Sequence, residues 1–393
     1  TGTLTLSSLN TYTGTTAITS GTVSASRIAV SGGASSLGNA SSAVTLGDAN
    51  SQGTLLYTGT SATFTRGLTL GASGGQLLVS DSTTTLTVST GNVTSTSGTF
   101  TVGGAGNTTF TSALSLGTGG LTKNDGGKLT VVSNTYTGIT TINGGILSTG
   151  TLANGGTASG IGTSGTAAAN LVLNGGTLQY TGTTVSSNRG FTLGTSGGTL
   201  DASGSGALTL GGTAAIGLAG TNTARTLTLT GTNTGNNTLA AAIGNNGTGA
   251  TSVVKEGSGT WVLSGTSTYT GATTVNAGIL ALGASNIMPG STALTVAGGG
   301  FNLNGNSDSV GSFAITSGSL FGSGKLTAAT YSLGGGTVAG NLGAGTMTVT
   351  ANSALNGTAD VTTVNLNAGT LTLGSASRFT SNQVVLTGST GAS

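Results

Sequence analysis

The chain has 393 residues, of which 76 are glycine and only 4% are charged, and its net charge is +2. Nucleic-acid binders cluster lysine and arginine, so these few scattered basic residues argue against a nucleic-acid partner. Histidine and cysteine are absent, which excludes Ser-His and Cys-His nucleophiles, disulfides and thiolate metal sites. We expect no cofactor. No run of about 18 apolar residues occurs, so we predict no transmembrane segment in this chain.

A Thr-Tyr-Thr-Gly cassette occurs three times, with its tyrosine at Tyr12, Tyr136 and Tyr269. A second similarity relates the segments around Arg66 and Arg189. Self-similarity of this kind is typical of stacked architectures, in which each unit buries its apolar face against its neighbours. We predict three units, 1–132, 133–265 and a divergent 266–393, in one continuous body without linkers.

Short segments alternate apolar residues with threonine, from 3–6 near the start through 207–210 and 226–230 to 370–373 near the end. This alternation predicts half-buried β-strands. A disordered low-complexity chain is the weaker interpretation, because 35% of the residues are hydrophobic. Glycine and threonine are poor helix formers. We therefore predict an all-β fold, a parallel β-helix (β-solenoid) forming a single elongated body of roughly 20 coils.

Asn-Gly-Gly and Asn-Ala-Gly punctuate the predicted strands, because asparagine and glycine tolerate the left-handed backbone angles of a corner. Such a turn is also typical of a hairpin, but tandem repetition favours bends in a coil. We predict inward corner positions, with amides bonded from coil to coil, for Asn143, Asn174, Asn276 and Asn367. An isolated, solvent-facing turn is the alternative for each of them.

The cassette tyrosines have two interpretations. They could stack on carbohydrate, or they could be structural, and the second is favoured because the ring in Thr-Tyr-Thr points opposite to both threonines. Trp261, the only tryptophan, stands where the copy of the motif around Tyr136 has Leu129 and is predicted to lie in the core.

Charged residues offer few candidates for chemistry. We expect Arg66 and Arg189 to cap turn carbonyls or to pair locally, with a ligand contact as the alternative. Two pairs are expected to be solvated and worth little: Lys123 with Asp125, and Lys255 with Glu256. None of the seven acids lies two or four residues from another, so no strand carries two of them on one face. This argues against a polysaccharide-active enzyme.

Residues 259–283 closely resemble the autotransporter-associated β-strand repeat, residues 123–147 are a second match, and residues 4–23 are a weaker third. The resemblance implies a right-handed β-helical passenger, carried on or released from a bacterial surface, and it brings no catalytic residues. A full autotransporter would end in a membrane β-barrel, and this sequence shows no such segment, which leaves the secretion route open.

These observations predict a non-catalytic, extracellular or outer-surface structural protein that forms a fibre, sheath or stalk. Neither end shows a polar cap, so the expected partner is another copy, end to end or laterally, or the rest of a longer chain. The alternative is an adhesin that binds surface glycans, with the divergent segment 287–290 and Phe301 as the place to look. An ice-binding face is less favoured, because the Thr-x-Thr spacings are irregular.

Overall fold

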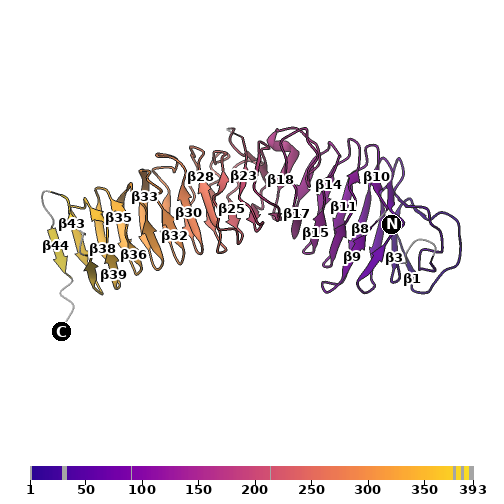
Figure 1. Ribbon diagram of the computed structural model, residues 1–393, viewed down its shortest axis with the longest axis horizontal. Helices are drawn as coiled ribbons and strands as arrows, with labels where there is room; N and C mark the ends of the chain where they lie inside the picture. Colours follow the sequence, from indigo (N-terminus) through magenta and orange to yellow (C-terminus); the bar gives the residue numbers. More distant parts are fainter. Residues whose placement is uncertain are drawn as a thin grey trace. The chain divides into compact units, whose positions relative to one another are not determined.

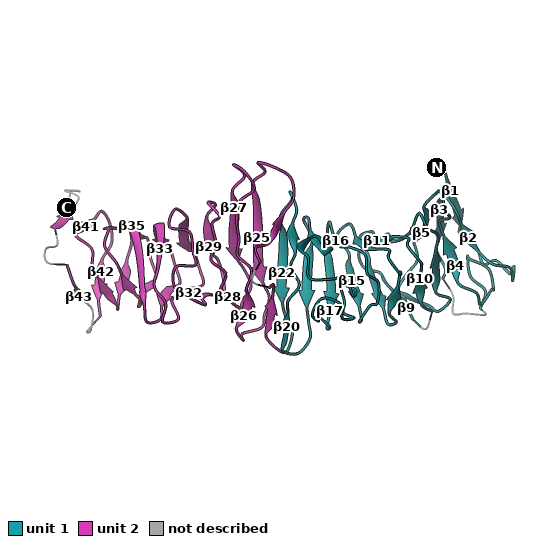
Figure 2. Ribbon diagram, turned by 90° about the horizontal axis from the view of Figure 1, so that it is seen from above, with its two compact units in different colours: residues 1–205 teal, residues 206–393 magenta. Residues whose placement is uncertain are grey.

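The computed structural model describes residues 2–28, 33–89, 91–212, 214–374, 378–381 and 385–388. They form two compact units, Thr1–Ser205 and Gly206–Ser393 (Figures 1 and 2). The described chain makes about 18 turns of an all-β parallel β-solenoid, close to the expected number. The division into three repeats and the single elongated body stay predictions.

In unit 1, one sheet is formed by β1 (Thr3–Leu6), β3 (Gly21–Ala25), β5 (Gly53–Tyr57), β8 (Gly75–Val79), β11 (Phe100–Gly103), β14 (Leu121–Lys123), β16 (Thr140–Ile142), β18 (Leu171–Leu173) and β21 (Thr192–Leu193). A second contains β2 (Ala17–Ile18), β4 (Val44–Leu46), β7 (Leu68–Leu70), β10 (Val93–Thr94) and β13 (Leu114–Ser115). A third contains β6 (Ala62–Phe64), β9 (Thr85–Val88), β12 (Asn107–Phe110), β15 (Lys128–Val131), β17 (Ile146–Thr149), β19 (Thr177–Tyr180) and β22 (Gly198–Ala202). The unit also holds β20 (Val185–Ser187) and the 3-10 helix η1 (Ala168–Asn170).

In unit 2, one sheet contains β25 (Arg225–Thr230), β27 (Thr251–Lys255), β29 (Thr273–Val275), β31 (Ala293–Val296), β33 (Asp308–Ile315), β35 (Lys325–Leu333), β37 (Asn341–Leu342), β38 (Thr346–Val349), β40 (Thr358–Ala359), β41 (Thr363–Leu366), β43 (Arg378–Phe379) and β44 (Val385–Gly388). The other contains β23 (Leu208–Leu210), β26 (Asn237–Leu239), β28 (Thr260–Leu263), β30 (Ile279–Leu282), β32 (Gly300–Asn302), β34 (Ser319–Phe321), β36 (Thr337–Val338), β39 (Ser353–Leu355) and β42 (Leu371–Leu373). β24 (Gly217–Leu218) completes the unit.

Strands pair in parallel with the equivalent strands of the coils before and after them. β5 lies between β3 and β8, with Tyr57 opposite Ala25 on one side and opposite Val79 on the other. In unit 2, β30 lies between β28 and β32 in the same way. A hairpin would make neighbouring strands antiparallel. The Asn-Gly segments are therefore bends in a coil, as predicted.

The core follows from the alternation of the sequence. In β5, Leu55 and Tyr57 point inward and are at most 2% exposed, while Thr54 and Leu56 are half-buried. A fully buried leucine contributes about 1.5–3 kcal/mol relative to an exposed one. Stacking the same pattern coil upon coil gives each unit a continuous aliphatic interior.

Glycine is required where two coils approach each other most closely. A Cβ atom on Gly53 would lie 1.7 Å from the carbonyl oxygen of Ile18 in the preceding coil. Gly126 lies in a turn of the same unit, and a Cβ atom there would have no neighbour within 4 Å. The two glycines therefore have different roles, one as a contact between coils and one as an open turn.

This difference predicts that alanine destabilises the chain much more at Gly53 than at Gly126. Gly53→Ala should lower the free energy of unfolding by about 2 kcal/mol or more, because the backbone of the adjoining coil must move. Gly126→Ala should change it by less than about 1 kcal/mol. Thermal unfolding followed by circular dichroism compares the two, and equal melting temperatures would contradict the close contact.

Candidate functional site

The cassette tyrosines of the second and third copies are buried. Tyr136 and Tyr269 are 0% exposed, and each hydroxyl lies 2.7 Å from a threonine hydroxyl, that of Thr140 and Thr273 respectively. Burial raises the pKa of both phenols, that of Tyr269 to about 12. Their surroundings match the structural interpretation rather than a carbohydrate platform.

The first cassette departs from this pattern, because Tyr12 is 42% exposed. The backbone N–H of Thr135, next to Tyr136, donates to the carbonyl of Leu114 in the preceding coil. The segment that follows β3 lies against this ring, because a Cβ atom on Gly38 would be 2.5 Å from Tyr12 Cε2. Its hydroxyl still lies 3.1 Å from that of Thr16.

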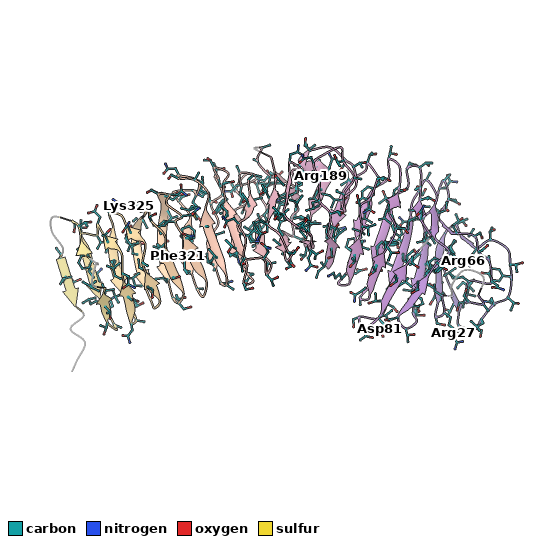
Figure 3. The ribbon with its side chains drawn as sticks, viewed as in Figure 1. Arg27, Arg66, Asp81, Arg189, Phe321 and Lys325 are labelled. Carbon is teal, nitrogen blue, oxygen red and sulfur yellow. The ribbon has the colours of Figure 1, made fainter. Side chains whose placement is uncertain are left out.

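Arg66 and Arg189 cap carbonyls of the chain itself, as the sequence predicted. The two side chains, labelled in Figure 3, are 5% and 2% exposed. Arg66 donates from Nη1 to the carbonyl of Leu37 at 2.6 Å, and Arg189 from Nη2 to that of Gly162 at 2.8 Å. Burial lowers the pKa of both guanidinium groups. Through these hydrogen bonds the two guanidinium groups hold in place the longer segments that follow β3 and β17.

The prediction of solvated pairs at Lys123 and Lys255 is wrong, because these side chains are 2% and 0% exposed. Each ammonium group donates to three backbone carbonyls, two in its own turn and one in the next coil: those of Asn124, Asp125 and Gly144 for Lys123, and of Glu256, Gly257 and Ala277 for Lys255. Both lysines end a strand in the inward phase of its alternation. That phase was readable in the sequence.

The corner asparagines point outward, so their predicted inward position is wrong. Asn143, Asn276 and Asn367 are exposed and Asn174 is half-buried. Asn143, Asn174 and Asn276 each directly follow a buried strand residue, and the next position of an alternating strand points outward. Bonds from coil to coil do occur: Asn143 Nδ2 donates to Asn124 Oδ1 at 2.9 Å, and Asn276 Nδ2 to Glu256 Oε1 at 2.6 Å.

Two buried asparagines that the sequence patterns did not single out bridge coils from inside. Asn134 and Asn237 are 0% exposed. Asn134 Oδ1 accepts the N–H of Leu114 at 2.9 Å, and its Nδ2 donates to the carbonyl of Gly160 at 3.0 Å. Asn237 likewise accepts from Leu208 and donates to Thr260. The recurrence of asparagine before Thr-Tyr-Thr was the available signal for Asn134.

Trp261 lies in the core as predicted, with 0% exposure and its Nε1 donating to the carbonyl of Thr230 at 2.7 Å. The divergent segment proposed for adhesion is not on the surface: Ile287, Met288 and Phe301 are 3%, 5% and 0% exposed. Asp308 holds this segment, because its Oδ2 accepts the N–H groups of Ile287 and Met288. Apolar side chains there fill the core.

Neither a metal centre nor a spanning helix is found in the described ranges of the chain. No group of three acidic side chains there could hold a metal ion. No helix in those ranges has the length and apolar character needed to cross a membrane.

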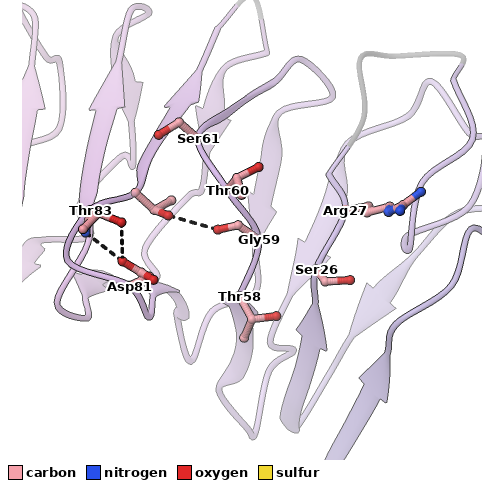
Figure 4. Close-up of a pocket in the computed structure, with 9 residues that line it drawn as sticks. Ser26, Arg27, Thr58, Gly59, Thr60, Ser61, Asp81 and Thr83 are labelled. Carbon is pink, nitrogen blue, oxygen red and sulfur yellow. Dashed lines mark hydrogen bonds between the residues drawn. The ribbon is translucent and has the colours of Figure 1, made fainter.

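A polar pocket lies at one corner of unit 1, where β3, β5 and β8 end (Figure 4). Its volume is about 650 Å³, and its lining is Ser26, Arg27, Thr58, Gly59, Thr60, Ser61, Asp81, Thr83 and Thr84. Asp81 Oδ1 accepts the hydroxyl of Thr83 at 2.7 Å, which lowers the pKa of the Asp81 carboxyl. Sequence analysis did not find this pocket, because its residues come from three coils.

Comparison with known proteins places these features in a family context. Three segments, 1–25, 121–148 and 253–282, match the passenger-associated-transport-repeat family. The chain is also 38% identical over 297 residues to the Adhesin BmaC autotransporter of Brucella suis biovar 1 (strain 1330), over 69% of the chain and 8% of that relative. No solved structure matches significantly.

These matches confirm the resemblance to β-helical repeat proteins of autotransporter passengers. Each matched segment contains one cassette tyrosine, and the second and third contain the buried lysines. Similarity to a passenger implies a secreted or cell-surface protein. The chain spans only 8% of the length of this relative.

Buried and exposed asparagines give a matched pair for testing the bridges between coils. Asn134→Ala should destabilise the chain by about 2 kcal/mol or more, because it leaves a buried N–H and a buried carbonyl without partners. Asn143→Ala should cost less than about 1 kcal/mol, since water replaces its partners. Chemical denaturation measures both changes in the free energy of unfolding. Equal losses at Asn143 and Asn134 would contradict the conclusion that Asn134 bridges buried backbone groups.

The buried lysines predict a pH dependence. Burial lowers the pKa of the Lys123 and Lys255 ammonium groups from 10.5 to about 8. Between these values the unfolded chain binds more protons than the folded chain, so the free energy of unfolding rises with pH. Above about pH 10 the buried tyrosines oppose this rise, because their pKa is raised on folding. We expect the melting temperature to increase from pH 7.5 to 9.5.

A double variant checks the origin of that increase. Replacing both lysines with methionine should flatten the profile between pH 7.5 and 9.5. Lys325→Met, at an exposed position in unit 2, should leave it unchanged. A flat profile in the unmodified chain would show that the two ammonium groups are not held at a lowered pKa.

Proposed function

We propose that this chain is a non-catalytic structural segment of a bacterial outer-surface or secreted protein, and that its stacked coils build a fibre, sheath or stalk. The in-register parallel pairing of successive coils carries this proposal. It gives each unit a repeated backbone hydrogen-bond ladder whose length is set by the number of coils. Such a body suits a spacer better than a catalyst.

The distribution of charge supports a structural role. Among the basic side chains that the structure describes, five are at most 5% exposed, namely Arg66, Lys123, Arg189, Arg225 and Lys255. They bond to the chain's own carbonyls, so they leave few cationic groups for surface chemistry. The surface therefore carries few charges, so salt has little effect on its interactions. It also offers few sites to proteases that cleave after lysine or arginine.

Exposed apolar side chains at the first and last described strands support association of coils. Leu4 in β1 is 58% exposed, and Leu386 in β44 is 66% exposed. Equivalent side chains in the interior coils are buried: Leu55, two coils after Leu4, and Val364, which pairs with Leu386, are each 1% exposed. Further coils, from a second copy or from the same longer polypeptide, would cover them.

Native cryo-electron microscopy and sedimentation velocity test this association on the purified chain. We expect assemblies that grow with concentration, because burying two leucines against another coil is favourable by about 1.5–3 kcal/mol each. A Leu4→Thr, Leu386→Thr variant should shift the assemblies toward single chains. Ile139→Thr, at a 49% exposed position within unit 1, is the matched control. A monodisperse monomer at all concentrations would contradict self-assembly.

A second candidate function is adhesion. The matched relative is named an adhesin, and unit 1 carries the polar pocket at the ends of β3, β5 and β8. Adhesion and a structural role are compatible, since a stacked body can present a binding corner.

A further inference from the structure

We propose that the pocket between Arg27 and Asp81 is a saccharide-binding groove for a glycan of at least two rings. This groove rests on the second candidate function, adhesion, for which it names the class of ligand. It is independent of self-assembly. Its ligand class follows from the lining, the spacing of the charges and an internal comparison within the chain.

The lining suits a ligand rich in hydroxyl groups. Arg27, Thr58, Thr60 and Asp81 are exposed, and the remaining lining residues are serine, threonine and glycine. Saccharide hydroxyls both donate and accept, so they match a mixed set of a carboxylate, a guanidinium and hydroxyls. A flat apolar ligand would find no aromatic or aliphatic wall here.

The charges stand at the two ends of the groove. Arg27 follows β3 and Asp81 follows β8, with β5 between them. Two steps of about 4.8 Å separate their coils, so the backbones at the two ends lie about 10 Å apart. A single sugar ring cannot reach both ends, whereas two linked rings can. One carboxylate is too few for a cation site, and one arginine is too few for a polyphosphate.

Both charged side chains are exposed at this corner and keep polar atoms that can bond to a ligand. Asp81 uses Oδ1 for the N–H and hydroxyl of Thr83, at 2.8 and 2.7 Å, which leaves Oδ2 to accept from a ligand. The backbone of Arg27 bonds with Ser36, and its side chain is exposed. The corner itself is built from other groups: Thr84 Oγ1 donates to the carbonyl of Gly59 at 3.0 Å.

The second repeat of the chain supplies the internal comparison. There the hydroxyl of Tyr180 donates to the carbonyl of Thr183, as that of Tyr57 donates to Thr60. A Cβ atom on Gly182 would meet the carbonyl of Gly150, as one on Gly59 would meet that of Ser26.

In this second corner, Thr151 stands where the first has Arg27, and Gly204 stands where the first has Asp81. The fold therefore forms this corner without either charge. Arg27 and Asp81 therefore occur at one of the two corners without being needed for its fold. We infer that their role there is to bind a ligand.

The test uses the full chain and a panel of neutral and carboxylate-bearing oligosaccharides of one to four rings, with binding followed by saturation-transfer NMR and calorimetry. We expect binding of members with two or more rings. Arg27→Ala and Asp81→Asn should each weaken it about tenfold, because each removes a charge-assisted hydrogen bond. Asp81→Asn retains an acceptor for Thr83, so the turn should persist.

Thr151→Ala, at the equivalent corner of the second repeat, is the matched control and should leave binding unchanged. Unaltered melting temperatures will show that the groove variants fold. Absence of binding across the panel, or equal binding by the unmodified chain and both groove variants, would overturn the proposal. Preference for carboxylate-bearing members would place the acidic group at Arg27, and preference for neutral members would place only hydroxyls there. Either preference supports the groove, and neither outcome bears on coil association.

Discussion

Each coil of this chain lies about 4.8 Å from the coils before and after it, and this spacing governs the rest of the structure. Side chains at the contact points must be small, and at Gly53 even a methyl group would strike the backbone of the adjoining coil. The glycine content and the short strands follow from this requirement. So does the alternation of threonine with aliphatic residues, because only one face of each strand reaches the core.

Close stacking creates a second requirement at the corners. Where strands end, backbone groups turn inward and lose their ladder partners, and a buried unpaired group costs about 1–3 kcal/mol. Lys123 and Lys255 satisfy carbonyls in two successive coils, and Asn134 bridges the coils on both sides of it. At the divergent segment 287–290, Asp308 instead accepts the inward-facing N–H groups of Ile287 and Met288. The sign of the buried charge thus follows from which backbone group faces the interior.

The corners are also where the copies of the repeat differ most in chemistry. Tyr57 and Tyr180 build the same turn in two copies, but only the first copy adds an arginine and an aspartate beside it. A repeated scaffold allows such variation, because the strands and not the exposed corners determine stability. A passenger-type solenoid can therefore acquire a binding surface at one corner while the neighbouring coils remain purely structural.

The sequence by itself determined the class of fold, since alternation, glycine corners and the repeated cassette all indicate parallel coils. It also placed Trp261 in the core and left Arg66 and Arg189 between carbonyl capping, local pairing and a ligand contact. Only the tertiary structure decided which carbonyls of the next coil the Lys123 and Lys255 ammonium groups reach, and that Phe301 fills the core. It alone brought Arg27 and Asp81 to one groove. The reason is physical: strand periodicity is local and readable, whereas contacts between coils depend on loop lengths that vary from turn to turn.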